Sequence, residues 1–211
     1  MKPFFILCLL SFGLNASELT AQSRYTVANG TLIFDMTIEE PSYEFTGSVE
    51  SYDAEAIQNY LFEMPEINTL RVTGPGGYGS AARAISAYLV QHSINTEAFG
   101  GCASACARIF LGGKSRRLAT GATLGFHRPW IDKESEKNFY KANRVKKKWE
   151  EEFDYVPWIY NVAIGDVVES IEFMRSRDVD IDFILKIYSI NSYDMWYPSR
   201  GELLEAGVLT E

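Results

Sequence analysis

The sequence is short of the residues on which metal sites and nucleic-acid surfaces depend. It has two histidines and three cysteines among 211 residues, and a zinc site needs several such ligands close together. Its 28 acidic residues outnumber its 20 basic residues, which gives a formal charge of −8. Binding to a phosphate backbone rests on clustered Lys and Arg, so this balance argues against nucleic acid as the main partner. We expect neither a metal nor another cofactor.

Low-complexity sequence and a membrane-spanning run are also lacking. Hydrophobic residues make up 46% of the chain, which is enough for one compact domain. The N-terminal apolar run, residues 4–14, is shorter than the ~20 residues that a spanning helix needs. Lys2 before the run and small residues after it are typical of a secretory signal peptide.

We therefore predict that residues 1–21 are a signal peptide, cleaved after Ala16 or after Ala21. Residues 22–211 then form a single exported domain in the periplasm, without a stable membrane anchor. Removal of the leader takes Cys8 with it and leaves Cys102 and Cys106. In an oxidising compartment these two cysteines could form a disulfide, but four residues is a tight separation unless the helix begins after Cys102. The sequence leaves both states open.

The order of predicted elements indicates an α/β fold. Residues 25–36 read as a hairpin around Asn29-Gly30, residues 43–46 as a strand and residues 53–64 as a helix. A strand, glycine turn and helix follow, and this order is then repeated. The first unit is predicted at 69–73, 74–77 and 81–90, the second at 96–99, 100–101 and 103–111, and a last strand at 123–126. Such repeats predict parallel strand pairing.

The composition shifts to charged residues after the last predicted strand. Residues 132–153 predict one long amphipathic helix, and residues 167–174, 181–187 and 202–206 predict shorter ones. We interpret residues 132–187 as an extended helical arm or insertion of the single domain. This arm is a candidate surface for self-association.

Two side chains are candidates for nucleophilic chemistry. Ser104 stands between two alanines at the start of a predicted helix, where free amide N–H groups favour negative charge. His127 ends a predicted strand, where a rigid scaffold can hold a base. Each signal is weak alone, because a serine in a helix and a lone histidine are usually structural.

Three segments occur in an order that resembles a known family. They are residues 72–77 (VTGPGG), 101–107 (GCASACA) and 124–129 (LGFHRP). The chain resembles the Clp protease proteolytic subunit and its relatives of the Clp/crotonase fold, and among them the exported Clp-like proteins of Gram-negative bacteria. The similarity covers about residues 43–129, with a further similarity at 199–208.

The resemblance implies roles for five residues. It makes Ser104 the nucleophile, His127 the general base, and the N–H groups of Gly77 and Ala105 the oxyanion hole. It makes Asp194 the acid that orients the histidine, with Asp178, Asp180 and Asp182 as the rival positions. The implied function is an exported, ATP-independent serine hydrolase, a peptidase acting on peptide or protein substrates as a homo-oligomer.

Other interpretations remain open at this stage. Either cysteine beside Ser104 could be the reactive group, and Lys114 could serve in a Ser–Lys dyad. Crotonase relatives act on coenzyme A thioesters, a substrate that an exported protein would rarely meet. The main alternative is a catalytically silent Clp-like scaffold that binds partners as an oligomer.

Overall fold

The computed structural model describes residues 23–38 and 47–211. This part of the chain forms a mixed α/β fold with one six-stranded sheet and seven α-helices. Strands β1 (Tyr25–Ala28) and β2 (Thr31–Asp35) form the predicted antiparallel hairpin. Asn29 and Gly30 have φ values of 50° and 70°, as a tight two-residue turn requires. The predicted signal peptide, residues 1–21, and the predicted strand at 43–46 lie outside the described residues.

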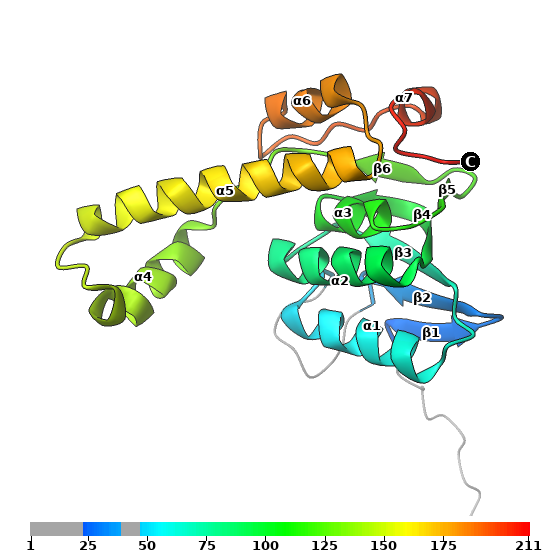
Figure 1. The fold of residues 1–211 in the computed structure, drawn as a ribbon, viewed down its shortest axis with the longest axis horizontal. Coiled ribbons are helices and arrows are strands. Elements are labelled where there is room, and N and C mark those ends of the chain that lie inside the picture. Colours follow the sequence, from blue (N-terminus) through cyan, green and yellow to red (C-terminus); the bar gives the residue numbers. More distant parts are fainter. Residues whose placement is uncertain (1–22, 39–46) are drawn as a thin grey trace, which may run out of the picture.

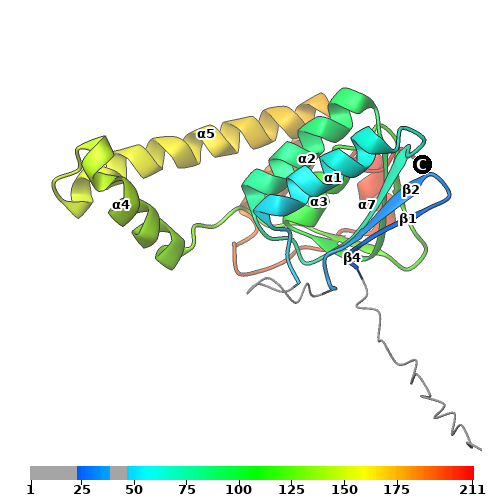
Figure 2. The same ribbon diagram turned by 90° about the horizontal axis from the view of Figure 1, so that it is seen from below.

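The remaining strands pair in parallel, as the strand-turn-helix repeats predict. The sheet order is β1-β2-β3-β4-β5, and β6 also pairs with β4. The bounds of these strands are β3 (Thr69–Gly74), β4 (Asn95–Ala103), β5 (Arg116–Leu118) and β6 (Thr123–Gly125). The connecting helices are α1 (Ser51–Glu63), α2 (Gly79–His92) and α3 (Ala105–Leu111), which lie together over one face of the sheet (Figures 1 and 2).

The hydrophobic core fills the space between the sheet and these three helices. Alternate strand residues point inward, so that side chains two apart on a strand share the buried face. The fully buried members from strands and helices are Leu32, Phe34, Leu70, Val72, Ala98, Ile57, Ile85, Leu89, Ile109 and Phe110. This packing fixes α3, and with it the junction between β4 and α3.

Strand β4 is longer than predicted. The glycines at 100 and 101 were expected to form a turn, but they lie inside the strand. The reason is β6, whose residues Thr123 and Gly125 pair with Gly101 and Ala103 and so extend the ladder. Strand β5 was not predicted, because two of its three residues are arginines and the segment shows no apolar alternation.

The charged region after β6 also differs from its prediction. Instead of one helix over 132–153, α4 (Lys133–Lys147) ends at Lys148, which adopts a left-handed conformation. A short 3-10 helix, η1 (Glu152–Asp154), then leads into the long helix α5 (Tyr155–Ser176). In Figures 1 and 2, α4 and the first half of α5 stand away from the sheet as a helical hairpin.

The tip of this hairpin is held by aromatic rings. Phe139 stacks on Trp158 with ring centroids 5.1 Å apart, and Trp149 meets Tyr155 edge to face at 5.0 Å. Tyr155 also donates its hydroxyl to Glu136, and burial is the main cause that raises the pKa of Tyr155. The aromatic contacts explain how a helix without a single buried residue keeps its place.

The C-terminal elements α6 (Ile181–Ser189) and α7 (Arg200–Glu205) pack beside β6 and the end of α5 (Figure 1). Arg116 joins them to the sheet. Its buried guanidinium donates to the carbonyls of Val208, Gly113, Arg177 and Gly207, which follow three helices. Burial lowers the pKa of Arg116 to about 10. In the described ranges no helix is long and apolar enough to cross a membrane.

Candidate active site

The nucleophile candidate lies at a strained strand-to-helix junction. Ser104 joins β4 to α3 with φ 55° and ψ −120°, a conformation that L-residues rarely adopt. Such a junction lifts the serine side chain out of the strand and places it before the first turn of the helix. The N–H of Ser104 donates to the carbonyl of Gly125 at 2.9 Å, which ties the junction to β6.

The disulfide that the sequence left open is present, and it encloses this junction. Cys102 and Cys106 are joined with their Cα atoms 5.2 Å apart. The spacing is achieved because Cys102 still belongs to β4 while Cys106 belongs to α3. Both cysteines are fully buried, so neither thiol is free to act as a nucleophile.

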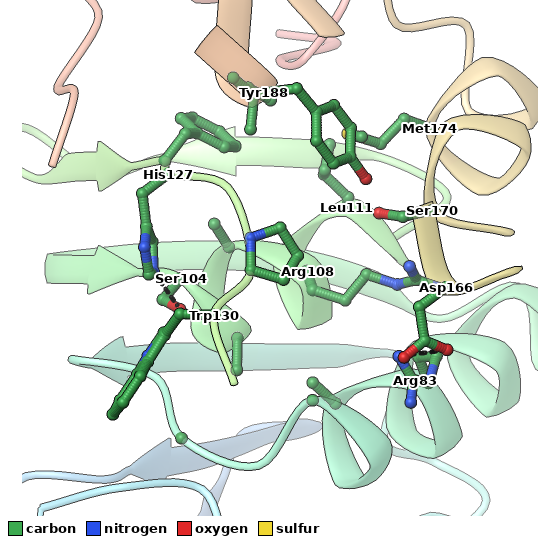
Figure 3. Close-up of a pocket in the computed structure, with 18 residues that line it drawn as sticks. Arg83, Ser104, Arg108, Leu111, His127, Trp130, Asp166, Ser170, Met174 and Tyr188 are labelled. Carbon is green, nitrogen blue, oxygen red and sulfur yellow. Dashed lines mark hydrogen bonds and ion pairs between the residues drawn. The ribbon is translucent and has the colours of Figure 1, made fainter. Parts of the chain in front are cut away.

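The structure brings together the two residues predicted to react. Nε2 of His127 lies 2.7 Å from Oγ of Ser104. Strand β6 delivers His127 to this position because it pairs with the end of β4, one residue before Ser104. Figure 3 shows the imidazole directed at the serine hydroxyl at one end of a cavity.

The predicted acid is not at the histidine. Nδ1 of His127 lies 3.0 Å from the main-chain carbonyl of Ser192. Asp194 is exposed, and its N–H donates to the carbonyl of Asn191 within a turn. Within residues 23–38 and 47–211, no hydrogen bond joins a carboxylate to His127. The prediction fails because residues 190–196 run antiparallel to residues 126–128. This path directs a main-chain carbonyl, rather than a carboxylate side chain, toward the imidazole ring.

This carbonyl decides where the imidazole carries its proton. A carbonyl only accepts, so Nδ1 must be the protonated nitrogen. Nε2 then has its lone pair available to accept from the Ser104 hydroxyl. The turn is anchored by paired main-chain bonds between Phe126 and Trp196, at 2.8 and 2.9 Å.

The glycine loop before α2 packs directly against the nucleophile. A Cβ on Gly76 would lie 2.8 Å from Cβ of Ser104 and from N of Ala105. A Cβ on Gly77 would lie 2.5 Å from the carbonyl oxygen of Val49. Both glycines have positive φ, 111° and 139°. No other residue fits this close approach, which explains the two consecutive glycines.

Among residues 23–38 and 47–211, the N–H groups of Gly77 and Ala105 make no main-chain hydrogen bond of a sheet or helix. Val49 bridges Gly77 in parallel, and the bonds of that bridge use the N–H groups of Val49 and Tyr78. The N–H of Gly77 therefore points away from Val49. Ala105 is the first residue of α3, where an N–H has no partner within the helix.

A cavity of about 230 Å³ extends from the serine and histidine. Its walls come from α2, α3 and, unexpectedly, α5, through Asp166, Ser170 and Met174. Figure 3 shows Ser104, His127 and Trp130 at one end and Arg83 with Asp166 at the other. Arg83 and Asp166 form an ion pair at 3.7 Å.

Sequence analysis missed the part that α5 plays in this wall. Arg108, one turn after Ser104, binds Glu169 of α5 through both terminal nitrogens, at 2.7 and 3.3 Å, and its guanidinium lies over the Phe173 ring. This contact fixes α5 on the helix that follows the serine. The residues of α5 that line the cavity recur every four positions in the sequence. Any helix packed on a core shows the same spacing, so the pattern does not indicate a role at the active site.

The arrangement offers a hydroxyl, a base and main-chain donors, but no cluster of metal ligands. Among the described residues, no three of His, Cys, Asp or Glu gather closely enough to hold a metal ion. A hydroxyl, a base and main-chain donors are the groups that proton transfer and nucleophilic attack use.

Comparison with solved structures finds many chains of similar fold, of which one is described below. The chain matches no protein-family model and no curated protein sequence. Its fold is similar to that of a ClpP1 variant from Listeria monocytogenes, with a TM-score of 0.49 and 18% identity, covering 78% of this chain and 86% of that one.

Proposed function

We propose that the protein is an exported, ATP-independent serine hydrolase of the peptidase class that uses Ser104 as nucleophile and His127 as general base. The observation that carries this proposal is the 2.7 Å contact between Oγ of Ser104 and Nε2 of His127 at the end of a cavity. The order of strand-turn-helix units and glycine loop favours a Clp/crotonase-like fold. The hairpin of α4 and α5 is then the arm of that fold.

The first chemical step is attack of Ser104 on a substrate carbonyl. Oγ forms a bond to the carbonyl carbon while its proton passes to Nε2 of His127. His127 then gives this proton to the departing amine as the C–N bond breaks, which leaves an acyl group on Ser104. Water, activated by the same nitrogen, hydrolyses the acyl group and restores the serine. Throughout, the carbonyl of Ser192 holds the ring through Nδ1–H.

We further propose that the N–H groups of Gly77 and Ala105 stabilise the oxyanion. Two facts support this assignment. Gly77 directs its N–H away from its bridge to Val49, and Gly76 brings the loop into contact with the first amide of α3. Removal of one such donor typically costs ~10²–10³ in rate.

The compartment is the periplasm in this proposal. The apolar run at residues 4–14 and the predicted cleavage after Ala16 or Ala21 support export. The disulfide between Cys102 and Cys106 supports it as well, since disulfides persist mainly in oxidising compartments. No ATP is available there, so the substrates are accessible or unfolded peptide segments.

We propose that the protein self-associates through the hairpin. Val156, Tyr160, Ile164 and Val168 recur every four residues on α5 and are 48–66% exposed. A continuous apolar stripe of this kind is typical of an interaction surface. Tyr160→Glu with Ile164→Asp should lower the mass measured by sedimentation, whereas Phe62→Asp, at an exposed ring on α1, should not. A monomeric wild-type protein would contradict self-association.

One observation favours a second candidate, a catalytically silent scaffold. His127 lacks a carboxylate partner in the described structure, and the same apolar stripe would serve a binding protein. A fluorophosphonate probe separates the two functions. It should label the processed wild-type protein and the control Ser189→Ala, but neither Ser104→Ala nor His127→Ala. A folded wild-type protein that takes no label would overturn the hydrolase and favour the scaffold.

A further inference from the structure

Two large aromatic side chains stand unusually exposed at the histidine end of the cavity. Trp130 is 53% exposed and lines the cavity, and Tyr193 is 87% exposed. Their ring centroids are 6.4 Å apart, and the ring planes are tilted by 45°. Isolated exposed rings need no explanation, but two neighbouring rings beside His127 form an exposed apolar surface at the cavity.

Both rings belong to the segments that hold His127. Trp130 follows His127 by three residues, and Tyr193 follows Ser192, whose carbonyl bonds Nδ1. The N–H of Tyr193 donates to Oδ1 of Asn191 at 3.1 Å, which fixes the backbone of this turn. Tyr193 therefore belongs to the turn that bonds the imidazole, and Trp130 to the segment that directly follows it.

The position of the pair identifies the part of a substrate that it meets. Nε2 of His127 must reach the departing amine, so the leaving segment lies on the His127 side of Ser104. The acyl side then extends into the cavity toward Asp166, at the opposite end from Trp130 (Figure 3). Trp130 and Tyr193 are thus next to the leaving segment.

We infer that Trp130 and Tyr193 form a binding site for a large apolar side chain at the first residue after the scissile bond. The inference rests on the proposed peptidase function and defines its substrate class. Both rings are more than half exposed, so an aromatic or branched apolar side chain can pack on them, gain offset stacking and lose water on binding. A substrate with glycine as the first residue after the scissile bond leaves both rings exposed to water.

The test uses paired peptides with the same acyl side and either Phe or Gly after the scissile bond. The wild-type protein should cleave the Phe peptide with kcat/KM about tenfold higher, chiefly through KM. Trp130→Ala and Tyr193→Ala should each reduce this preference, with the larger loss on the Phe peptide. Tyr193→Phe keeps the ring and should keep the preference. Phe62→Ala removes an exposed ring far from the site and serves as the matched control.

Two readouts distinguish failure of this site from failure of the hydrolase. Fluorophosphonate labelling carries no leaving peptide, so labelling of the wild-type protein reports on Ser104 and His127 whether or not the aromatic site binds a substrate. In Ser104→Ala, which cannot cleave, a peptide beginning with Phe should bind more tightly than one beginning with Gly, and Trp130→Ala added to it should abolish the difference. If the labelled wild-type protein shows no Phe preference, or if both alanine variants retain it, the inference is wrong. Absence of labelling alone would overturn the hydrolase.

Discussion

The main-chain carbonyl of Ser192 lies 3.0 Å from Nδ1 of His127, where a catalytic triad holds a carboxylate. A carbonyl fixes the tautomer and the orientation of the ring as a carboxylate does. It brings a dipole instead of a full negative charge, so it stabilises the imidazolium less. The site is therefore a serine-histidine pair oriented by the backbone.

This relationship predicts the behaviour of Asp194. Asp194→Asn should leave kcat and the labelling rate within about twofold of wild type, because the carboxylate does not contact the ring. In enzymes with a true aspartate at this position the same change lowers kcat by about 10⁴. Steady-state kinetics on one peptide measure the difference, with His127→Ala as the inactive reference. A loss of kcat near ~10⁴ in Asp194→Asn would show that Asp194 does act on His127.

The close packing of Gly76 on the nucleophile predicts a steric loss of activity. Gly76→Ala introduces a Cβ 2.8 Å from Cβ of Ser104 and N of Ala105, at a φ of 111°. We expect the labelling rate to fall by at least ~10²–10³, the cost of a disturbed oxyanion donor. Gly121→Ala is the matched control, because Gly121 has a positive φ of 77° but nothing within 4 Å of its Cβ. Equal losses in both variants would assign the effect to backbone strain alone.

The disulfide predicts a coupled change in stability and reactivity. Cys102→Ala with Cys106→Ala removes a cross-link between residues four apart, which in the chain-entropy model costs about 2 kcal/mol of unfolding free energy. Labelling of Ser104 should also slow, because the strained junction is no longer enclosed on both sides. Denaturant titration and labelling kinetics provide the measurements. Reduction should reproduce both effects in wild type and add nothing in the double variant; unchanged labelling after reduction would argue against this role.

The cap of α7 predicts an acid-sensitive part of the stability. Hydrogen bonds from the Ser199 side chain and main-chain N–H lower the pKa of Glu202 from its ordinary value of 4.5. The folded state thus binds fewer protons than the unfolded state just below that value. The free energy of unfolding contributed by Glu202 is present above pH 4.5 and is lost as pH falls through the lowered pKa.

Glu202→Gln should therefore flatten the acid side of the stability curve, measured by urea unfolding at several pH values. Glu205→Gln, on the same helix but outside the cap, is the control and should leave the curve unchanged. An unchanged curve in Glu202→Gln would show that the cap bonds do not contribute to stability.

The sequence indicated the core of the fold because its signals there are local. The turn at Asn29-Gly30, the glycines before α2 and the alternation of apolar residues each act within a few neighbours. The prediction of a turn at glycines 100 and 101 was wrong because these residues are held in strand β4 by pairing with β6, which lies more than 20 residues later in the chain. The break after α4 was missed because charged residues continue through it without a change of pattern.

Sequence alone indicated which residues could react, since only two histidines are present and Ser104 stands between two alanines at a predicted helix start. Tertiary structure decided which of them meet. The pairing of β6 with β4 brings His127 to Ser104 across 23 residues of chain. The return of residues 190–196 then places a carbonyl at Nδ1. A backbone carbonyl is present at every residue and carries no mark in the sequence, so only the folded path of the chain could assign it.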